Sequence, residues 1–236
     1  MKKIILILLI FSLSSSKGQN VKQDLSYVTY KFKSTGGESN KSKRFDPTLL
    51  DFEFLFDKQR SLFRIIDKMD LNQSQDYKIT SIIYGGNLVY FRDNVAKEKL
   101  FNVNYKGQSL NVINSKQEYK WDLLSESKYI GGFKCFKAVT KIIKNDQGRN
   151  TVKTLNPIVW FTPDIPTSFG PFGLDGLPGL IIEGTMDGLA FFYADKFILN
   201  SNKNIQIDRP EKSIDIFETD FDSMMSEDFI NSRIKK

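Results

Sequence analysis

Most of this chain alternates apolar and polar residues with a period of two, and this pattern limits the folds open to it. Successive side chains of a β-strand point to opposite faces, so alternation is typical of strands with one buried and one solvated face. The pattern recurs between turn signals in residues 27–33, 50–56, 61–67, 77–84, 88–92, 99–103, 110–113, 120–124, 133–143, 152–161 and 189–197. We therefore predict a mainly β fold, a single curved antiparallel sheet or a partly open barrel.

Two shorter features complete the predicted fold. Residues 163–179 contain four prolines and four glycines, and we expect this stretch to cap the sheet; the residues are Pro163, Pro166, Pro171, Pro178, Gly170, Gly173, Gly176 and Gly179. A short C-terminal helix is predicted over residues 227–234, with Ser226 as its N-cap. Acidic residues come early and basic residues late in this segment, as the helix dipole favours.

The first residues predict export. Lys2 and Lys3 precede an apolar run over residues 4–13, which is too short to span a bilayer, since spanning needs about 20 residues. Small residues follow, so we predict a signal peptide at 1–18 that is cleaved before Gln19; an uncleaved N-terminal membrane anchor is the alternative. Residues 19–236 then form a single β-rich domain without a transmembrane span, in the periplasm, associated with the outer membrane, or secreted.

The charge of the chain is modest and dispersed. The formal net charge is +6, from 34 Lys and Arg against 28 Asp and Glu. Removing 1–18 takes away Lys2, Lys3 and Lys17, which leaves 34 − 3 − 28 = +3. Acidic residues interrupt the basic ones throughout the chain, whereas a nucleic-acid surface needs a dense basic patch. We expect no nucleic-acid partner.

The absence of histidine and the single Cys135 exclude several kinds of chemistry. A Ser or Cys nucleophile normally relies on a histidine base, and a metal site built from soft ligands needs several Cys or His. We therefore predict no catalytic residues, no metal and no cofactor. Cys135 cannot form an intramolecular disulfide; it is either a buried, inert thiol or a thiol activated by Lys134 and Lys137.

The Pro/Gly-rich stretch and its flanks form the candidate interaction loop. Glycine permits positive φ and proline fixes φ near −65°, so these residues define a backbone path and carry no reactive group. Such a loop is either a rigid cover over one end of the sheet or a partner-binding surface. The candidate residues are Trp160, Phe161, Pro163, Asp164, Pro166, Gly170, Pro171, Gly176, Leu177, Pro178, Gly179, Leu180 and Ile181.

Two further sets of side chains leave alternatives open. Phenylalanines on the predicted strands and in the loop either line an apolar cavity or fill a core; they are Phe52, Phe54, Phe56, Phe63, Phe91, Phe101, Phe161, Phe169, Phe172, Phe191, Phe192 and Phe197. Carboxylates gather near the loop and either stabilise turns, bind calcium or form an acid/base pair; they are Asp164, Asp175, Glu183, Asp187 and Asp195.

Three segments together resemble one family. They are residues 130–138, preceded by Trp121; residues 160–166, Trp-Phe-Thr-Pro-Asp-Ile-Pro; and residues 170–181, which end in Gly-Leu-Pro-Gly-Leu-Ile. Their order and spacing resemble the GLPGLI family, exported proteins of Gram-negative bacteria. The resemblance implies an exported, non-catalytic protein of a family without an established activity. The strand pattern also looks like that of the curved antiparallel sheets in periplasmic lipoprotein carriers, which is an analogy of fold alone.

Three functional hypotheses follow. The preferred one is an exported, non-enzymatic envelope protein that binds or carries a hydrophobic ligand or binds an envelope protein partner. The second is an accessory subunit that docks on an outer-membrane protein complex through the loop and the edge strands. The third, and least favoured, is a hydrolase that depends on carboxylates.

Overall fold

The computed structural model describes residues 25–33, 45–68, 74–114, 118–146, 151–201 and 205–234. The predicted signal peptide at 1–18 and its cleavage point before Gln19 lie outside these residues. Within the described ranges, neither helix has the length and hydropathy needed to cross a membrane.

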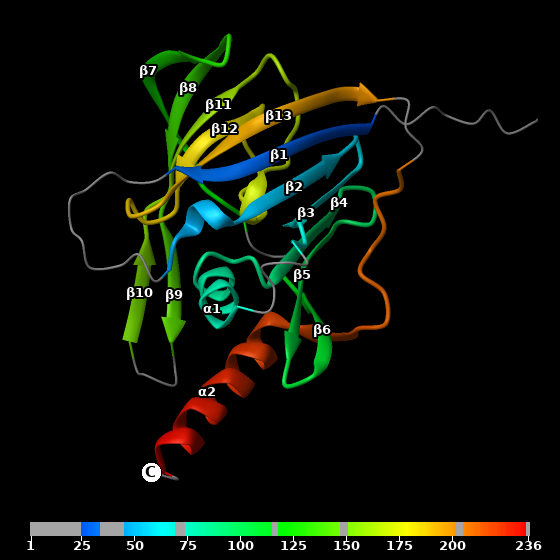
Figure 1. The fold of residues 1–236 in the computed structure, drawn as a ribbon, viewed down its shortest axis with the longest axis vertical. Helices are drawn as coiled ribbons and strands as arrows, with labels where there is room; N and C mark the ends of the chain where they lie inside the picture. The colour runs from blue at the N-terminus through cyan, green and yellow to red at the C-terminus, as the bar shows by residue number, and fades with distance from the viewer. Residues whose placement is uncertain are drawn as a thin grey trace, which may run out of the picture.

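One large, open sheet dominates the molecule (Figure 1), which confirms the predicted mainly β fold. It has 12 strands in the order β14-β6-β5-β4-β3-β2-β1-β13-β12-β11-β8-β7 and does not close into a barrel. All its pairs are antiparallel except β14 with β6. The strands are β1 (Leu25–Lys33), β2 (Asp51–Phe56), β3 (Arg60–Ile65), β4 (Leu88–Asp93), β5 (Glu98–Tyr105), β6 (Gln108–Ile113), β7 (Asp122–Ile130), β8 (Phe133–Val139), β11 (Ile158–Thr162), β12 (Leu180–Thr185), β13 (Phe191–Ser201) and β14 (Ile214–Phe217).

A separate two-stranded ribbon consists of β9 (Ile142–Asp146) and β10 (Thr151–Leu155). The sequence pattern predicted single runs over 133–143 and 152–161, and both predictions are wrong because each run divides between the sheet and this ribbon. The divisions lie opposite each other, where the Thr140 N–H donates to the carbonyl of Pro157 over 3.1 Å. Proline has no N–H to donate, so the strand ladder is interrupted at this point.

Strand β1 joins the two halves of the sheet. Tyr30 lies opposite Phe52 of β2 on one side and opposite Ala194 of β13 on the other. The N-terminal strand therefore lies beside a strand more than 160 residues later, and Figure 1 shows both as long arrows through the upper part of the sheet. Folding must bring these distant segments together before the sheet is continuous.

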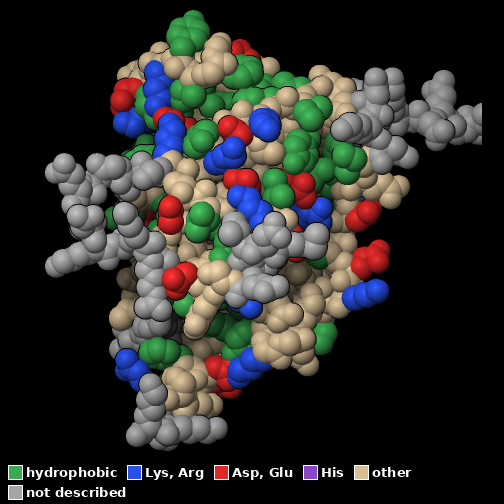
Figure 2. Space-filling view, in the orientation of Figure 1, with side chains coloured by type: hydrophobic (Ala, Val, Ile, Leu, Met, Phe, Trp, Pro, Cys, Tyr) green, Lys and Arg blue, Asp and Glu red, His purple; other side chains and the backbone are tan. Residues whose placement is uncertain are grey.

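The period-two pattern determines the two faces of the sheet. Val28, Tyr30 and Phe32 of β1 are buried in the main core, together with Phe52 and Phe54 of β2. The opposite face carries ion pairs, in which Lys31 pairs with Asp195, Arg64 with Glu53 and Lys33 with Glu183. It also carries a second, smaller apolar cluster of Leu25, Leu55, Leu62, Phe91, Leu100 and Ile207. Figure 2 shows basic and acidic side chains interspersed on one face of the molecule rather than gathered by sign.

Two helices differ from the sequence predictions. Residues 77–84 were predicted as a strand but lie in α1 (Gln75–Ile83) and its C-cap Tyr84; Ser74 caps the N-terminus. The predicted C-terminal helix exists but is longer, because α2 runs over Glu218–Ile234 and Ser226 lies inside it. Phe221 and Met224 of α2 pack with Phe101 and Ile216 against the core at the β6 end of the sheet. This packing stabilises the first turns of α2, which the sequence prediction did not include.

Candidate functional site

The Pro/Gly-rich stretch between β11 and β12 packs against the core face of the sheet. Phe161, Leu177, Leu180 and Ile181 each expose 4% or less of their surface. The Tyr30 hydroxyl donates to the carbonyl of Ile181 over 2.6 Å, deep inside the core. These four candidate loop residues therefore hold the stretch in place by packing, and they are not available to a partner in this structure.

A buried ion-pair cluster ties this stretch to the other half of the sheet. Asp175 is 9% exposed, and its carboxylate accepts from Arg92 Nε over 3.2 Å and lies 2.9 Å from Lys99 Nζ. The Trp121 indole N–H donates to the carbonyl of Asp175 over 2.8 Å. Arg92 belongs to β4 and Lys99 to β5, so these charges link the C-terminal loop to N-terminal strands.

Close backbone packing explains two of the glycines. A Cβ added to Gly170 would lie 1.9 Å from the carbonyl oxygen of Leu174, and one added to Gly179 would lie 2.1 Å from that of Thr162. Real Cβ atoms do not come this close to backbone oxygens, so a larger residue would displace the loop. Gly176 has a φ of 92°, a conformation that favours glycine.

Phe172 has the left-handed backbone conformation, with φ 56° and ψ 24°, although it is not a glycine. Such a residue costs of order 1–3 kcal/mol, which the surroundings must offset. Its ring lies 4.6 Å from the ring of Phe63 and 5.1 Å from those of Phe52 and Phe192, measured between centroids. These ring contacts hold Phe172 in its strained conformation, where it forms part of the wall of a cavity.

The other candidate loop residues lie at or near the surface. Pro163, Asp164, Pro166, Gly176 and Pro178 are exposed, while Gly170, Pro171 and Gly179 are buried. Asp164 and Pro166 border a hollow of about 330 Å³ together with residues of β1, the β2–β3 turn and β13. Trp160 is partly buried against the main core, and Lys128 Nζ lies 4.2 Å from its ring centre. The structure therefore does not gather the candidate residues into one surface.

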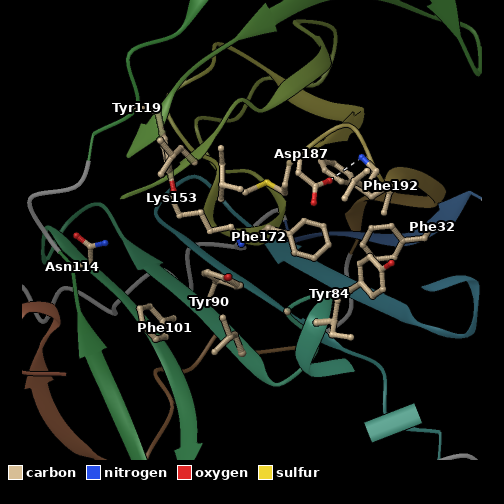
Figure 3. Close-up of a pocket in the computed structure, with 18 of the residues that line it drawn as sticks. Phe32, Tyr84, Tyr90, Phe101, Asn114, Tyr119, Lys153, Phe172, Asp187 and Phe192 are labelled. Atoms are coloured by element: carbon tan, nitrogen blue, oxygen red, sulfur yellow. Dashed lines mark hydrogen bonds between the residues drawn. The ribbon is translucent and has the colours of Figure 1, made fainter. Parts of the chain in front are cut away.

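An aromatic cavity of about 330 Å³ lies at the ends of α1, β10 and the β12–β13 turn (Figure 3). Seven aromatic side chains line it: Phe32, Phe101, Phe172, Phe192, Tyr84, Tyr90 and Tyr119. Its volume lies at the lower end of the range for ligand pockets, about 300–1,000 Å³. The sequence left open whether the phenylalanines fill a core or line a cavity, and the structure shows both. Most of them fill the core, while Phe101, Phe172 and Phe192 border the cavity. We call this hollow the aromatic cavity.

Burial keeps the tyrosines of the aromatic cavity protonated at neutral pH. It raises the pKa of Tyr90 to about 12, against a small opposing effect of Arg92. Burial likewise raises the pKa of Tyr119 well above its ordinary value. For Tyr84, burial is the main cause of a raised pKa and the negative charge of Asp187 is the next. These hydroxyls are therefore neutral hydrogen-bonding groups on an apolar wall.

Ion pairs occupy several of the carboxylates that were candidates for acid/base chemistry. Asp195 pairs with Lys31, and Glu183 pairs with Lys33 and Lys128. Burial pushes the pKa of Glu183 upward, but the hydrogen bonds and charges of Lys128 and Lys33 outweigh it and lower the pKa. A carboxylate held ionised in this way is poorly suited to act as a general acid at neutral pH. Asp187 instead accepts the Leu189 N–H over 2.9 Å in a turn.

Cys135 is fully buried in the main core, and burial raises the pKa of its thiol to about 11. Of the two readings open from sequence, the geometry favours the inert thiol, because the thiolate is the reactive form. No group of three or more potential metal ligands occurs among the residues that the structure describes.

Sequence reasoning did not single out Tyr84, Tyr90, Tyr119 or Lys153, which all line the aromatic cavity. They belong to elements far apart in the chain: the end of α1, strand β4, the segment before β7 and strand β10. No local spacing connects them. Only the sheet order and the position of the β9–β10 ribbon bring them together.

Comparison with known proteins gives a partial family match and a fold. A family model described as a protein of unknown function (Porph_ging) matches residues 144–183, which include β10, β11, the Pro/Gly-rich stretch and most of β12. A search of curated proteins found no match.

Among solved structures, PNGF-II is similar in two crystal forms. The TM-scores are 0.55 and 0.53, each at 14% identity, over 88% and 87% of this chain. The chain spans about a third of PNGF-II, 33% and 32% in the two forms. At this level of identity the similarity concerns the fold alone.

Proposed function

We propose that this protein is an exported, non-enzymatic binding or carrier module for a small apolar ligand, and that it belongs to the GLPGLI family. The aromatic cavity is the observation that carries the proposal. Seven aromatic side chains from seven segments of the chain surround one hollow of about 330 Å³. The lining also contains Asn114 and four charged side chains, and aromatic walls that carry a small number of polar groups are typical of sites for small organic molecules.

The surroundings of the aromatic cavity support binding rather than further packing. Ile83 and Leu189 border it and are 54% and 74% exposed, so apolar side chains lie at its mouth and are open to solvent. Its size excludes a whole phospholipid and suits a ring compound or a short chain. Export rests on the sequence of residues 1–18, which predicts release into the periplasm, association with the outer membrane, or secretion.

Two measurements test this function. The first is native mass spectrometry, with solvent extraction, of the protein purified from its own envelope without detergent; we expect a co-purifying apolar small molecule. The second uses the neutral fluorescent probe N-phenyl-1-naphthylamine. We expect Leu189→Trp to fill the mouth of the aromatic cavity and weaken probe binding about tenfold or more, equivalent to about 1.4 kcal/mol.

Val95→Trp is the matched control, because Val95 is 71% exposed on the β4–β5 turn and does not line the aromatic cavity. It adds the same indole at a distant place and should leave probe affinity unchanged. If the probe fails to bind, or if both variants bind it like the original protein, the carrier function is wrong.

A second candidate function is docking on an outer-membrane protein complex, and strand β7 favours it. β7 is nine residues long and forms one edge of the sheet. Tyr129 and Leu123 on it are 76% and 58% exposed. An edge strand presents unpaired backbone groups to which another chain can add a strand. If docking occurs, photo-crosslinking from position 129 in cells should capture an envelope protein. If docking does not occur, no crosslinked product should form.

A further inference from the structure

The charges on the wall of the aromatic cavity indicate the kind of ligand it takes. Four charged side chains line it: Arg92, Lys153, Asp187 and Glu218. Arg92 is neutralised by Asp175 inside the protein, as described above. Glu218, the first residue of α2, also interacts with another group of the protein. Neither charge needs a ligand.

Lys153 and Asp187 differ from these two. Neither forms an ion pair with any residue that the structure describes. Elsewhere in the molecule, facing opposite charges do pair, as Lys31 of β1 does with Asp195 of β13 at 2.9 Å. The aromatic cavity therefore brings one basic and one acidic side chain to the same hollow without joining them.

The two charges come from different sides. Lys153 is on β10, and Asp187 is in the turn between β12 and β13. Figure 3 shows both side chains extending toward the ring of Phe172. Asp187 Oδ1 accepts the Leu189 N–H, and this hydrogen bond holds the carboxylate in place. The other carboxylate oxygen, Oδ2, can then accept from a ligand. The negative charge of Asp187 is also felt at Tyr84, whose pKa it helps to raise.

Aromatic rings line the same hollow as the two charges. The ring of Phe172 is 5.1 Å from that of Phe192 and 5.9 Å from that of Phe32, and Phe32 is 5.3 Å from Tyr84. A flat apolar body can pack on these rings. A cationic group near their faces gains attraction from the ring electrons, and Asp187 adds a full negative charge on the same side.

We propose that the ligand of the aromatic cavity is a small zwitterion with an aromatic body, whose carboxylate pairs with Lys153 and whose ammonium group pairs with Asp187. This inference rests on the proposed function and narrows its ligand to one whose apolar aromatic body carries two opposite charges. Both side chains are exposed, so a neutral ligand leaves them hydrated and unpaired, whereas a zwitterion gives each an opposite charge. A ligand with a single charge would meet one opposite and one like charge.

Four compounds built on one ring test the inference: 4-(aminomethyl)phenylacetate, benzylamine, phenylacetate and toluene. Their dissociation constants can be measured by chemical-shift titration of the ¹⁵N-labelled protein. We expect the zwitterion to bind at least about threefold more tightly than any of the others, since partly exposed ion pairs have modest strength. The shifts should occur at amides around Phe172, Asp187 and Lys153.

Two variants test which charged group of the ligand pairs with Asp187 and which with Lys153. Asp187→Asn should weaken 4-(aminomethyl)phenylacetate and benzylamine about threefold, and should leave phenylacetate as tight or slightly tighter because a like charge is removed. Lys153→Gln should weaken the zwitterion and phenylacetate, and should leave benzylamine as tight or slightly tighter for the same reason. Asp122→Asn and Lys196→Gln are the matched controls, because both residues are exposed and neither lines the aromatic cavity. These control variants should leave the dissociation constants of all four compounds unchanged.

The outcomes separate the two proposals. If toluene binds as tightly as the zwitterion, or if Asp187→Asn and Lys153→Gln leave the affinity of the zwitterion within twofold, the inference about charge is wrong while an apolar binding site stands. If none of the four compounds shifts amides of the aromatic cavity, and N-phenyl-1-naphthylamine also fails to bind, both the inference and the proposed function are wrong.

Discussion

Asp175 precedes Gly176 in the Pro/Gly-rich stretch, and its carboxylate lies between Arg92 and Lys99. The side chains of Asp175 and Arg92 are 11% and 10% exposed, so the pair is largely removed from water. Removing one partner of a buried pair leaves the other charge without compensation. Asp-Gly in the sequence indicated a turn, and nothing in the sequence connected it to charges on β4 and β5.

We expect Asp175→Asn to lower the free energy of unfolding by about 3 kcal/mol, because Arg92 would stay buried, and Lys99 partly buried, beside a neutral amide. Urea denaturation measures the change. Asp195→Asn is the control: its partner Lys31 is 36% exposed, so the loss should stay below about 1 kcal/mol. Equal losses in the two variants would show that the buried cluster has no special role.

Cys135 gives a second prediction for a single residue. Burial raises the pKa of its thiol from 9.0 to about 11, so at pH 8 the folded protein contains very little thiolate. We expect Ellman's reagent to react with it only after unfolding in urea. The pH dependence follows from the same shift: the unfolded thiol ionises first as pH rises, so this group destabilises the fold between about pH 9 and 11.

Cys135→Ala removes this contribution, so the stability of the variant should fall less steeply than that of the original protein over that pH interval. Rapid labelling of the folded protein at pH 8 would contradict the prediction. It would place the thiol at the surface instead of in the main core.

The elements show which parts of the fold local sequence determines. Strands such as β2 and β3 were predicted because their alternation separates two faces: one face meets the main core, and the other carries ion pairs and a smaller apolar cluster with Leu55 and Leu62. Helix α1 was missed because Ile79, Ile82 and Ile83 are β-branched, and because residues 77–80 alternate apolar and polar. Ser74, which caps its N-terminus, was the available signal.

The Pro/Gly-rich stretch was predicted as an element of fixed backbone, and Gly170 and Gly179 show the physical reason, since neither leaves room for a Cβ atom. Its attachment was not predictable. The contacts of Phe172 and Asp175 depend on strand order over the whole sheet, which period-two alternation does not encode. The aromatic cavity was unpredictable for the same reason.

Helix α2 gives a prediction for an element. Phe221 and Met224 face the strands, and the rings of Phe221 and Phe101 are 5.9 Å apart, whereas Ile230 is 46% exposed. We expect Phe221→Ala to lower the free energy of unfolding by about 2 kcal/mol through lost apolar burial. Ile230→Ala, the control, should cost less than about 0.5 kcal/mol. Equal costs would mean that α2 does not pack on the sheet through Phe221.

At the scale of the whole molecule, one core spans both halves of the sheet. The main core contains Phe54 and Phe63 from the N-terminal strands and Val159 and Ile182 from the C-terminal ones, with Phe172 packed among them. The Arg92–Asp175 pair and the β1–β13 pairing cross the same boundary. Neither half can bury its apolar face without the other, so we expect a single cooperative unfolding transition.

Two local probes in opposite halves test this expectation. The slowest-exchanging amides of β2 and β12 should give the same free energy of opening by native-state hydrogen exchange, because both are released only by global unfolding. Both tryptophans, Trp121 and Trp160, lie in the C-terminal half, so fluorescence reports that half while far-UV circular dichroism reports all strands. Their urea transitions should coincide. A fluorescence transition separated from the dichroism transition, with lower protection in one strand than in the other, would mean that the halves unfold independently and that the contacts between them are weak.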